Sequence, residues 1–568
     1  MSAARIVRVV TEVAAVDKAF DYLVPDGLSI DVGDRVRVDL HGRSVRGWVL
    51  ETDVADEGHD LKPLKKWAGF GPPPSFFEIA RWASRHYVTP LSRALAAASP
   101  DRNVISLPNP PAKTTIATQQ SFSPGVWELP PTTDPIEVVL SAYASTHQSD
   151  GSLLVLVPTE GWAERLTARL TSRGVPAVTL ADNWSAVRAG WPVVVATRNG
   201  CFAPTPSLCG VVVLDADDEA YVSESSPTWE AARIVAERCR LEDVPLWLCS
   251  PLPSPSTQAL SSQHHVGSDA NGRWPLLTVV DRRRSDPRDG ALSQETLRLV
   301  DRVLHDGETG VRVAIVLQRL GAGRLLACRQ CGELFRCAQC REPERETDGS
   351  LSCRNEHERR DSFCRSCGAT KPRVIRAGIT TLARDVALQI GREVIEVSAA
   401  TTDIPTDTSV VVGTEAIFRV VRRAGLVIFV DFDQYLLGHS ERARRDAVYA
   451  VAKAGRMVGG RREGRGQVVL QTRRGDDDVL RALERTDFAE ISREEVATAQ
   501  LLGLPPFGAL AEIGGSKGED FASALREAGV PVVRDGDRWI VHATSHEVLR
   551  ELLAKAPRPS GAMRLAIR

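Results

Sequence analysis

Residues 211–221 read VVVLDADDEAY, in which three Val and a Leu run directly into a row of acidic residues. A short, continuous apolar run of this kind is typical of a strand that is buried on both faces of a parallel sheet. The acids would then lie at the carboxyl end of the strand, which is where an ATPase keeps the carboxylate that holds Mg²⁺. Asp215 and Asp217 are candidate magnesium ligands, or only the polar residues that end a strand.

Further runs of the same type lie on both sides of this stretch. SLLVLVP, PVVVAT and PLWLCS alternate with segments of helical spacing such as TEGWAERLTARLTSRG. A second series follows with VRVAIVLQ, TSVVVGT, GLVIFVDF and GQVVLQT. Strands that alternate with helices in this way predict an α/β protein with two doubly wound parallel sheets.

The composition sets limits on the function. The chain has 568 residues and a formal net charge of −2, so only local basic patches could hold a nucleic acid. No apolar run is long enough for a membrane span, and the first residues lack the apolar core of an export signal. We expect a cytoplasmic protein without a membrane partner.

Seven of the eleven Cys lie within 40 residues. They form three C-x₂-C pairs and one single thiol: Cys328/Cys331, Cys337/Cys340, Cys364/Cys367 and Cys353. Two such pairs can complete a tetrahedral zinc site, and a chain without an export signal favours metal over disulfides. Unliganded thiols and an iron–sulfur cluster are the alternatives. The other four Cys stand in apolar surroundings typical of core residues: Cys201, Cys209, Cys239 and Cys249.

Seven thiolates do not fill two four-cysteine sites, so one ligand must be of another type. His357 follows Cys353 at an acceptable spacing for a nitrogen ligand, and Glu356 is the alternative. We predict two structural zinc ions. The first has the ligands Cys328, Cys331, Cys364 and Cys367; the second has Cys337, Cys340, Cys353 and His357. Residues 312–376 carry 14 Lys or Arg against 8 Asp or Glu, which indicates a phosphate-binding patch or a solvated face.

Several segments, taken in order, resemble one known family. They are FDYLVP (20–25) with VGDRVRV after it, ATRNGCFAP (196–204), the cysteine cluster, VVVGTEAIF, GQVVLQT and FAEISREEVATAQLLGLPPF. Together they resemble the PriA family, superfamily 2 helicases that restart collapsed replication forks. The resemblance implies two RecA-like helicase lobes, an N-terminal β-rich DNA-binding domain, a zinc-binding insertion and a small α+β C-terminal domain.

The resemblance also implies a pocket for a DNA 3′ end. Its residues here would be Phe20, Asp21, Tyr22, Gly42 and Lys62. Aromatic faces can stack on a base and a lysine can meet a phosphate, so the set is chemically reasonable. The alternative is that FDY is only a strand with core aromatics.

The chain departs from this family where nucleotide would bind. The dipeptide Gly-Lys of a phosphate loop is absent, and LPPTTDPIEV stands in its place. Pro135 replaces the lysine and Ile136 the Mg²⁺-binding hydroxyl. Ala216 replaces the glutamate that activates water, and Lys453 an arginine finger, whereas Arg456 is kept. We therefore expect neither ATP and Mg²⁺ as cofactors nor catalytic residues.

The resulting hypothesis is a replication-restart protein without helicase activity, which recognises the 3′ end of the leading strand at branched forks. Its partners would be branched and single-stranded DNA, single-stranded DNA-binding protein and proteins that load the replicative helicase. Two alternatives remain open: an active, unconventional DNA-dependent ATPase, and a non-enzymatic zinc-ribbon module for nucleic acid. The expected domains are 1–103 (DNA 3′ end), 104–131 (linker), 132–274 (lobe 1), 275–326 and 371–499 (lobe 2), 327–370 (zinc insertion) and 500–568 (C-terminal).

Overall fold

The computed structural model describes the chain outside residues 1–4, 14–17, 57–59, 269, 286–288, 306–309, 319–325, 340–343, 348–349, 354–356, 371, 375–378, 438–441, 465, 537 and 560–562. The chain forms two compact units. Unit 1 comprises residues 1–129, 134–267 and 492–568, and unit 2 comprises residues 130–133 and 268–491.

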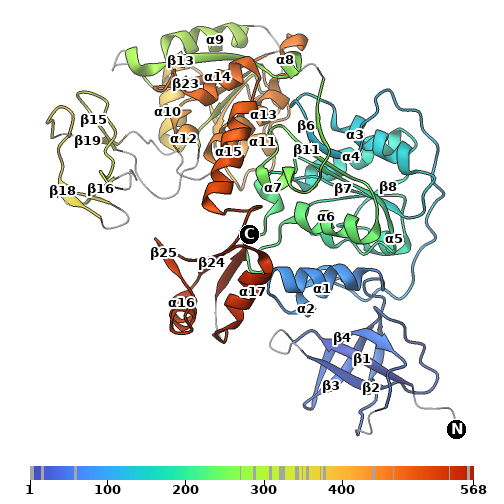
Figure 1. Cartoon of the computed structure of the whole chain (residues 1–568). Helices are drawn as coiled ribbons and strands as arrows, with labels where there is room; N and C mark the ends of the chain where they lie inside the picture. Colours follow the sequence, from blue (N-terminus) through green and yellow to red (C-terminus); the bar gives the residue numbers. More distant parts are fainter. Residues whose placement is uncertain are drawn as a thin grey trace. The chain divides into compact units, whose positions relative to one another are not determined.

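Unit 1 begins with a five-stranded antiparallel sheet of order β2-β1-β4-β3-β5, dark blue in Figure 1. Its elements are β1 (Ile6–Thr11), β2 (Ala19–Leu23), β3 (Arg35–Leu40), β4 (Arg43–Thr52), β5 (Lys66–Gly69), α1 (Phe76–His86) and α2 (Leu91–Ala97). Alternating apolar residues of these strands, among them Val7, Val36 and Val38, form a core of their own. Main-chain hydrogen bonds join Leu23 to Lys62 and Leu64, which closes the sheet beside β2.

The segment predicted as a linker is anchored and ends in a strand. Lys113 Nζ donates to the carbonyl of Ser149 at 2.7 Å, and the Thr114 amide donates to the Tyr143 hydroxyl at 2.9 Å. The strand β6 (Gly125–Glu128) then joins the parallel sheet of lobe 1. Its few residues between Pro- and Ser-rich flanks gave no periodic signal in the sequence.

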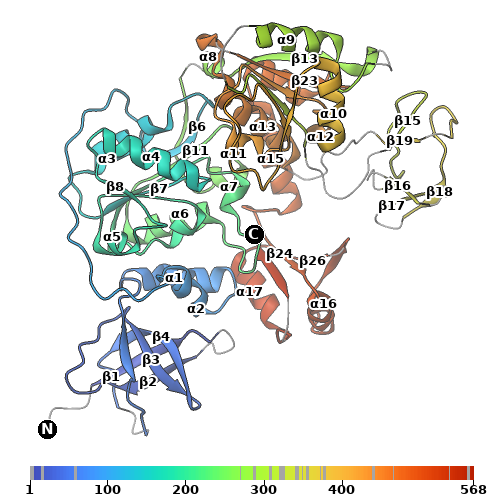
Figure 2. The ribbon, with the colours of Figure 1, turned by 180° about the vertical axis from the view of Figure 1, so that it is seen from behind.

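Lobe 1 is a seven-stranded parallel sheet of order β12-β6-β11-β10-β7-β9-β8. Helices cover both faces, with α3 and α4 on one side and α5 and α6 on the other (Figure 2). Its further elements are α3 (Pro135–Thr146), β7 (Ser152–Leu156), α4 (Glu160–Ser172), β8 (Ala177–Thr179), α5 (Trp184–Ala189), β9 (Val193–Ala196), η1 (Arg198–Phe202), β10 (Leu208–Leu214), η2 (Glu219–Tyr221), α6 (Ala231–Glu242), β11 (Leu246–Ser250), α7 (Pro255–Gln258) and β12 (His264–Val266).

The C-terminal residues of unit 1 form a split βαββαβ domain with sheet order β25-β26-β24-β27. Its elements are β24 (Ala509–Gly514), α16 (Gly518–Glu527), β25 (Val533–Asp535), β26 (Arg538–Ala543), α17 (His546–Ala554) and β27 (Arg564–Ile567). The helix α15 (Ala489–Leu502) precedes it. The Ile567 amide contacts the Thr228 hydroxyl at 3.3 Å, which ties this domain to lobe 1.

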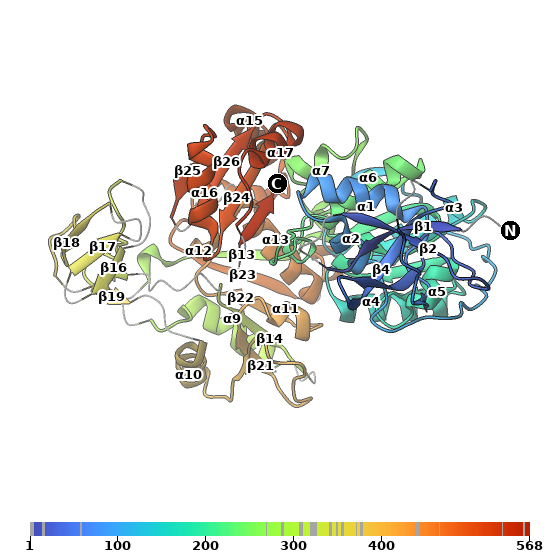
Figure 3. The ribbon, with the colours of Figure 1, turned by 90° about the horizontal axis from the view of Figure 1, so that it is seen from below.

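Unit 2 contains the six-stranded parallel sheet β13-β23-β22-β14-β21-β20. Figure 3 labels β13, β23, β22, β14 and β21 of this sheet. Helices α9 and α10 cover one face, and α13 packs on β22 and β23. The elements are α8 (Ala270–Arg273), β13 (Leu276–Asp281), η3 (Arg282–Arg284), α9 (Gln294–His305), β14 (Val313–Val316), α10 (Ile379–Ile390), β20 (Ile395–Val397), β21 (Val410–Gly413), α11 (Ile417–Val420), β22 (Leu426–Phe429), α12 (Asp433–Leu436), α13 (Ala443–Val458), η4 (Arg461–Glu463), β23 (Gln467–Thr472) and α14 (Asp478–Arg485).

The cysteine cluster lies in a small β-rich insertion between β14 and α10. It consists of the pair β15 (Leu326–Cys328) and β19 (Pro372–Val374) and a sheet of β16 (Glu344–Thr347), β17 (Ser350–Cys353) and β18 (Arg359–Asp361). The predicted fold class, two parallel α/β lobes with a β-rich N-terminal domain, an insertion and an α+β C-terminal domain, is confirmed. Among the described helices, none combines the length and hydrophobicity that crossing a bilayer requires.

The central strand of lobe 1 gives a test of this packing. Val212 on β10 is fully buried, so Val212→Asn should lower the free energy of unfolding by roughly 2–5 kcal/mol, because the amide would have no polar partner in the sheet. Val266→Asn is the matched control, since Val266 on β12 is 69% exposed and should change stability by less than about 0.5 kcal/mol. Chemical denaturation of both variants measures the difference, and equal losses would contradict the assigned packing.

Candidate functional site

A hairpin in the N-terminal domain gathers three of the five residues that were predicted to bind a DNA end. The two-residue turn His41–Gly42 has φ of 51° and 80°, as a tight type I′-like turn requires. A Cβ at position 42 would meet no neighbouring atom, so glycine is favoured there by its positive φ and not by a lack of space. Its amide donates to Asp39 Oδ1 at 3.1 Å.

Asp39, the last polar residue before this turn, is the centre of the group. Lys62 Nζ donates to Asp39 Oδ1 at 2.8 Å and Lys65 Nζ to Oδ2 at 3.1 Å. The Tyr22 hydroxyl donates to the main-chain carbonyl of Asp39 at 3.1 Å. The hydrogen bonds from Lys62, Lys65 and the Gly42 amide hold the pKa of Asp39 well below its usual range. Asp39 was not among the residues predicted to bind the DNA end.

The aromatic residues of the predicted pocket differ in accessibility. Tyr22 is 4% exposed and its ring lies in the core of the domain, so it cannot offer a face to a base. Burial, with a contribution from Asp39, raises the pKa of Tyr22. Phe20 is only partly buried, and Lys18 Nζ lies 5.8 Å from the centre of its ring. Phe20 is therefore the aromatic side chain that a base could reach.

Asp21 is separated from this group. Because side chains alternate along a strand, Asp21 points away from the face of Phe20 and Tyr22. It lies opposite Arg8 on β1, whose guanidinium donates to both Asp21 carboxylate oxygens at 2.9 and 3.1 Å. Arg8 also contacts Glu51 at 3.1 Å. The structure thus brings together Tyr22, Gly42 and Lys62 but places the Asp21 carboxylate in a different ion-pair cluster.

Further cations follow the same face as Asp39. Arg37 pairs in register with Arg46 on β4 and with Lys66 on β5. Glu12 neutralises Arg46 at 2.6 and 3.0 Å. Among the residues that the structure describes, Arg37 and Lys66 have no ion-pair partner. This arrangement can attract an anion such as a phosphate.

The first predicted metal group is assembled from two equivalent turns. The amide of Gly332 donates to the carbonyl of Cys328, and the amide of Gly368 donates to that of Cys364. Both glycines have positive φ, 79° and 75°, which a turn of this type needs. Each turn therefore directs its two thiols toward the same point.

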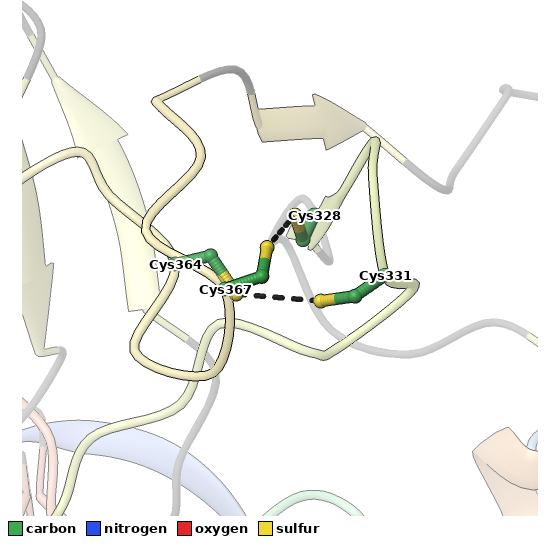
Figure 4. A group of neighbouring side chains, drawn as sticks. All are labelled: Cys328, Cys331, Cys364 and Cys367. Carbon is green, nitrogen blue, oxygen red and sulfur yellow. Dashed lines mark hydrogen bonds between the residues drawn. The ribbon is translucent and has the colours of Figure 1, made fainter.

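The four sulfur atoms of this group converge in Figure 4. The Sγ atoms of Cys328 and Cys367 lie 3.4 Å apart, and those of Cys331 and Cys364 lie 3.5 Å apart. Ligands at about 2.3 Å from a tetrahedral zinc would be about 3.8 Å from one another, so the donor set fits this ion. Hydrogen bonds, chiefly from the Cys331 amide, lower the pKa of Cys328 to about 6. The pKa of Cys331 is raised instead, because a hydrogen bond from the Glu333 amide is outweighed by the contacts with the other three thiols.

Three of the four predicted donors of the second group also converge. Cys337, Cys353 and His357 have donor atoms within 4.8 Å of one another and could hold a metal ion. Cys337 and Cys353 are buried, whereas His357 is exposed. The fourth predicted ligand, Cys340, and the alternative ligand Glu356 lie outside the described residues.

A buried ion pair lies in the insertion beside both groups. Arg360 donates to the two carboxylate oxygens of Glu344 at 2.9 and 2.6 Å, and Glu344 has no exposed surface. The guanidinium also lies near the rings of Phe335 and Phe363, at 5.8 and 5.5 Å from their centres. Phe335 packs with Cys328 and Cys364, so the arginine lies against the core that surrounds the first cysteine group.

The segment that stands in the place of a phosphate loop supplies its own acidic cap for the following helix. Asp134 caps α3, accepting from the Ile136 amide at 3.2 Å, and Pro135 occupies the first turn without an N–H group. Arg169 binds both carboxylate oxygens of Asp134 at 3.0 and 2.6 Å. Partial burial opposes ionisation, but these hydrogen bonds lower the pKa of Asp134. A negative charge thus stands at the helix N-terminus, where a nucleotide phosphate would need to bind.

Two of the acidic residues after β10 accept hydrogen bonds from nearby hydroxyl and amide groups of the protein. Asp217 accepts from the Ser250 hydroxyl at 2.8 Å, the Ser254 amide at 3.1 Å and the Thr257 hydroxyl at 2.7 Å. Asp218 caps the short helix η2. Asp215 has a positive φ of 56° and is 6% exposed. Asp217 and Asp218 therefore hold the turn in place, and their carboxylates are engaged by protein donors.

In unit 2, Lys453 and Arg456 project from α13. Lys453 Nζ lies 3.7 Å from a carboxylate oxygen of Glu415, which also accepts from the Tyr435 hydroxyl at 3.0 Å. Arg456 Nε donates to the carbonyl of Pro131 at 3.3 Å. Pro131 belongs to residues 130–133, which are part of this unit. Lys453, which the resemblance aligns with an arginine finger, thus has an acidic partner.

Comparison with known proteins adds to this geometry. Residues 8–100 match the family model described as the 3′ DNA-binding domain of PriA. The probable replication restart protein PriA of Mycobacterium leprae is 25% identical over 91% of this chain and 88% of the relative. The chain resembles PriA. Replication restart protein PriA of Thermotoga maritima is 23% identical over 61% of this chain and 50% of its own length.

The likeness to PriA that the sequence predicts is therefore confirmed, and it extends from the N-terminal domain through both lobes. The chain spans about half the length of the Thermotoga PriA that it matches. Among solved structures, a DEAD box protein from Methanococcus jannaschii is 11% identical, with a TM-score of 0.28, over 64% of this chain and 86% of that protein.

Proposed function

We propose that this chain is a replication-restart protein that recognises branched replication forks at the 3′ end of the leading strand and helps to reload the replicative helicase. The match of residues 8–100 to the PriA 3′ DNA-binding domain carries the proposal. The cationic surface around Lys62, Lys65 and Lys66 supports it, because phosphates bind to such surfaces. The role would place the protein in the cytoplasm at the nucleoid, with helicase-loading proteins and single-stranded DNA-binding protein as its partners.

The 3′-end recognition can be tested with Lys62→Ala. We expect this variant to lose about 3- to 30-fold in affinity for forks that carry a 3′ hydroxyl at the branch, and less for forks that lack it, because one phosphate-binding cation is removed from the pocket. Fluorescence anisotropy with the two forks measures the effect.

Lys517→Ala is the matched control, since Lys517 is also an exposed lysine in an ion pair, with Asp520 at 2.8 Å, and lies outside this domain. Equal losses of Lys62→Ala on both forks would show that the residue binds DNA without regard to its end.

We further propose that the chain binds forks without unwinding them. Asp134 occupies the helix N-terminus that a phosphate loop would offer, and the chain has no lysine there and no carboxylate at position 216. The two lobes would then act as a scaffold that joins the DNA-binding domain to the insertion. The alternative, an unconventional DNA-dependent ATPase, depends on Asp215, the first acidic residue after β10.

The rate of phosphate release from ATP tests this part of the proposal. We expect the same background rate with and without forked DNA, and no change in Asp215→Ala, because the phosphates have no lysine or backbone cradle to bind them. A DNA-stimulated release of phosphate that Asp215→Ala abolishes would establish the ATPase instead.

We propose that the metal in both cysteine groups is zinc, held by Cys328, Cys331, Cys364 and Cys367 in one case and by Cys337, Cys340, Cys353 and His357 in the other. Filled tetrahedral sites leave no open position for a substrate, so the ions would supply folding energy to the insertion. A zinc ribbon module that serves another nucleic acid is disfavoured by the match of residues 8–100 to a DNA-binding domain.

Elemental analysis should find about two zinc ions per chain, and Cys364→Ser should leave about one, because a thiolate of one complete donor set is lost. Cys239→Ser is the control, since Cys239 is buried on α6 of lobe 1 and belongs to neither group, and should keep both ions. Iron, or no metal, in the purified protein would contradict the assignment.

A further inference from the structure

Lys62 and Lys65, the two cations that a DNA phosphate would bind, already form ion pairs with the carboxylate of Asp39. Lys62 reaches Oδ1 at 2.8 Å and Lys65 reaches Oδ2 at 3.1 Å, so each lysine has its own oxygen. The lysine side chains are 60% and 42% exposed and that of Asp39 is 20% exposed. A ligand can therefore reach both ammonium groups, but it meets a negative charge between them.

The position of this carboxylate is fixed by the fold. Asp39 is the penultimate residue of β3, and the amide of Gly42 in the adjoining turn donates to Oδ1 at 3.1 Å. The Tyr22 hydroxyl holds the main-chain carbonyl of the same residue at 3.1 Å. Asp39 thus cannot swing away from the lysines without breaking the contacts of the turn. It behaves as a built-in anion in the place where a phosphate would bind.

We propose that Asp39 is a specificity-determining residue, an internal anion that weakens the binding of uninterrupted phosphate backbone at Lys62 and Lys65 and favours a DNA end whose hydroxyl can donate to it. The preference for an end rests on the function proposed above. The suppression of backbone binding does not, because it follows from the charge arrangement alone.

Chemistry explains the selectivity. A carboxylate accepts a hydrogen bond from a hydroxyl group but repels a phosphate, so the pocket distinguishes the two groups by the sign of one interaction. Arg37 and Lys66 on the same face keep the long-range attraction for DNA, since among the described residues neither has an ion-pair partner. The surface can thus attract DNA electrostatically, while Asp39 reduces the contacts that DNA phosphates make with Lys62 and Lys65.

The test is Asp39→Asn, measured on covalently closed circular duplex DNA, which has no ends. Asparagine keeps an oxygen for the Gly42 amide but removes the charge. We expect binding roughly 3- to 10-fold tighter at about 0.1 M salt, and a steeper dependence of log Kd on log salt by about one to two, since each released lysine adds a phosphate contact. On forks, the ratio of affinities for a 3′ hydroxyl and a 3′ phosphate should fall toward one.

Two controls separate this role from a structural one. Asp53→Asn frees Arg5 from its 3.2 Å ion pair in the same domain and should leave both the affinity and the salt slope unchanged. In a Lys62→Ala/Lys65→Ala background, Asp39→Asn should have no effect on the salt slope, because no lysine remains to be released. Asp39→Ser repeats the test if the asparagine variant unfolds.

Unchanged or weaker binding of Asp39→Asn to circular DNA, with the folded state verified by its thermal unfolding, would overturn the proposal. A gain on circular DNA in a protein that shows no preference for 3′ ends would instead keep the role of Asp39 as an internal anion and remove the proposed recognition of ends. The two failures are therefore distinguishable.

Discussion

Burial on both faces is the constraint on which the two lobes depend. Every residue of β10 is buried, and the adjacent strands β7 and β11, with β9 beyond β7, are also largely apolar and buried. A parallel strand in this position must be hydrophobic along its whole length, because helices cover it on both sides. This requirement concerns side-chain packing alone. A lobe can therefore keep its strands and their order while the residues at the strand ends change.

The loop before α3 illustrates such a change. A helix N-terminus has unpaired N–H groups and a partial positive charge, and it needs an anionic or polar partner. Asp134 provides that partner from within the chain and is itself held by Arg169. The turn after β10 is similar, where Asp217 accepts hydrogen bonds from Ser250 on β11 and from Ser254 and Thr257 at the start of α7. In both places, a carboxylate at the end of an element stabilises the fold by accepting hydrogen bonds from the protein.

Features that depend on residues close together in the sequence could be predicted from it, whereas features that depend on contacts between distant residues could not. The C-x₂-C-Gly turns are local, so the spacing of Cys328, Cys331, Cys364 and Cys367 was enough to predict one donor set. The alternation of β2 would also have separated Asp21 from Tyr22. The role of Asp39 was not predictable, since its lysines follow 23 and 26 residues later and approach it only through the closure of the sheet.

The Arg360 side chain has a consequence for how the insertion tolerates mutation. It pairs with Glu344, which has no exposed surface, and lies near the rings of Phe335 and Phe363. Phe335 in turn packs with Cys328 and Cys364 of the first cysteine group. Loss of the arginine alone would leave a buried carboxylate without its cation, which costs about 3–5 kcal/mol, whereas replacing both partners with apolar residues would cost much less. The two positions would therefore tend to change together in evolution.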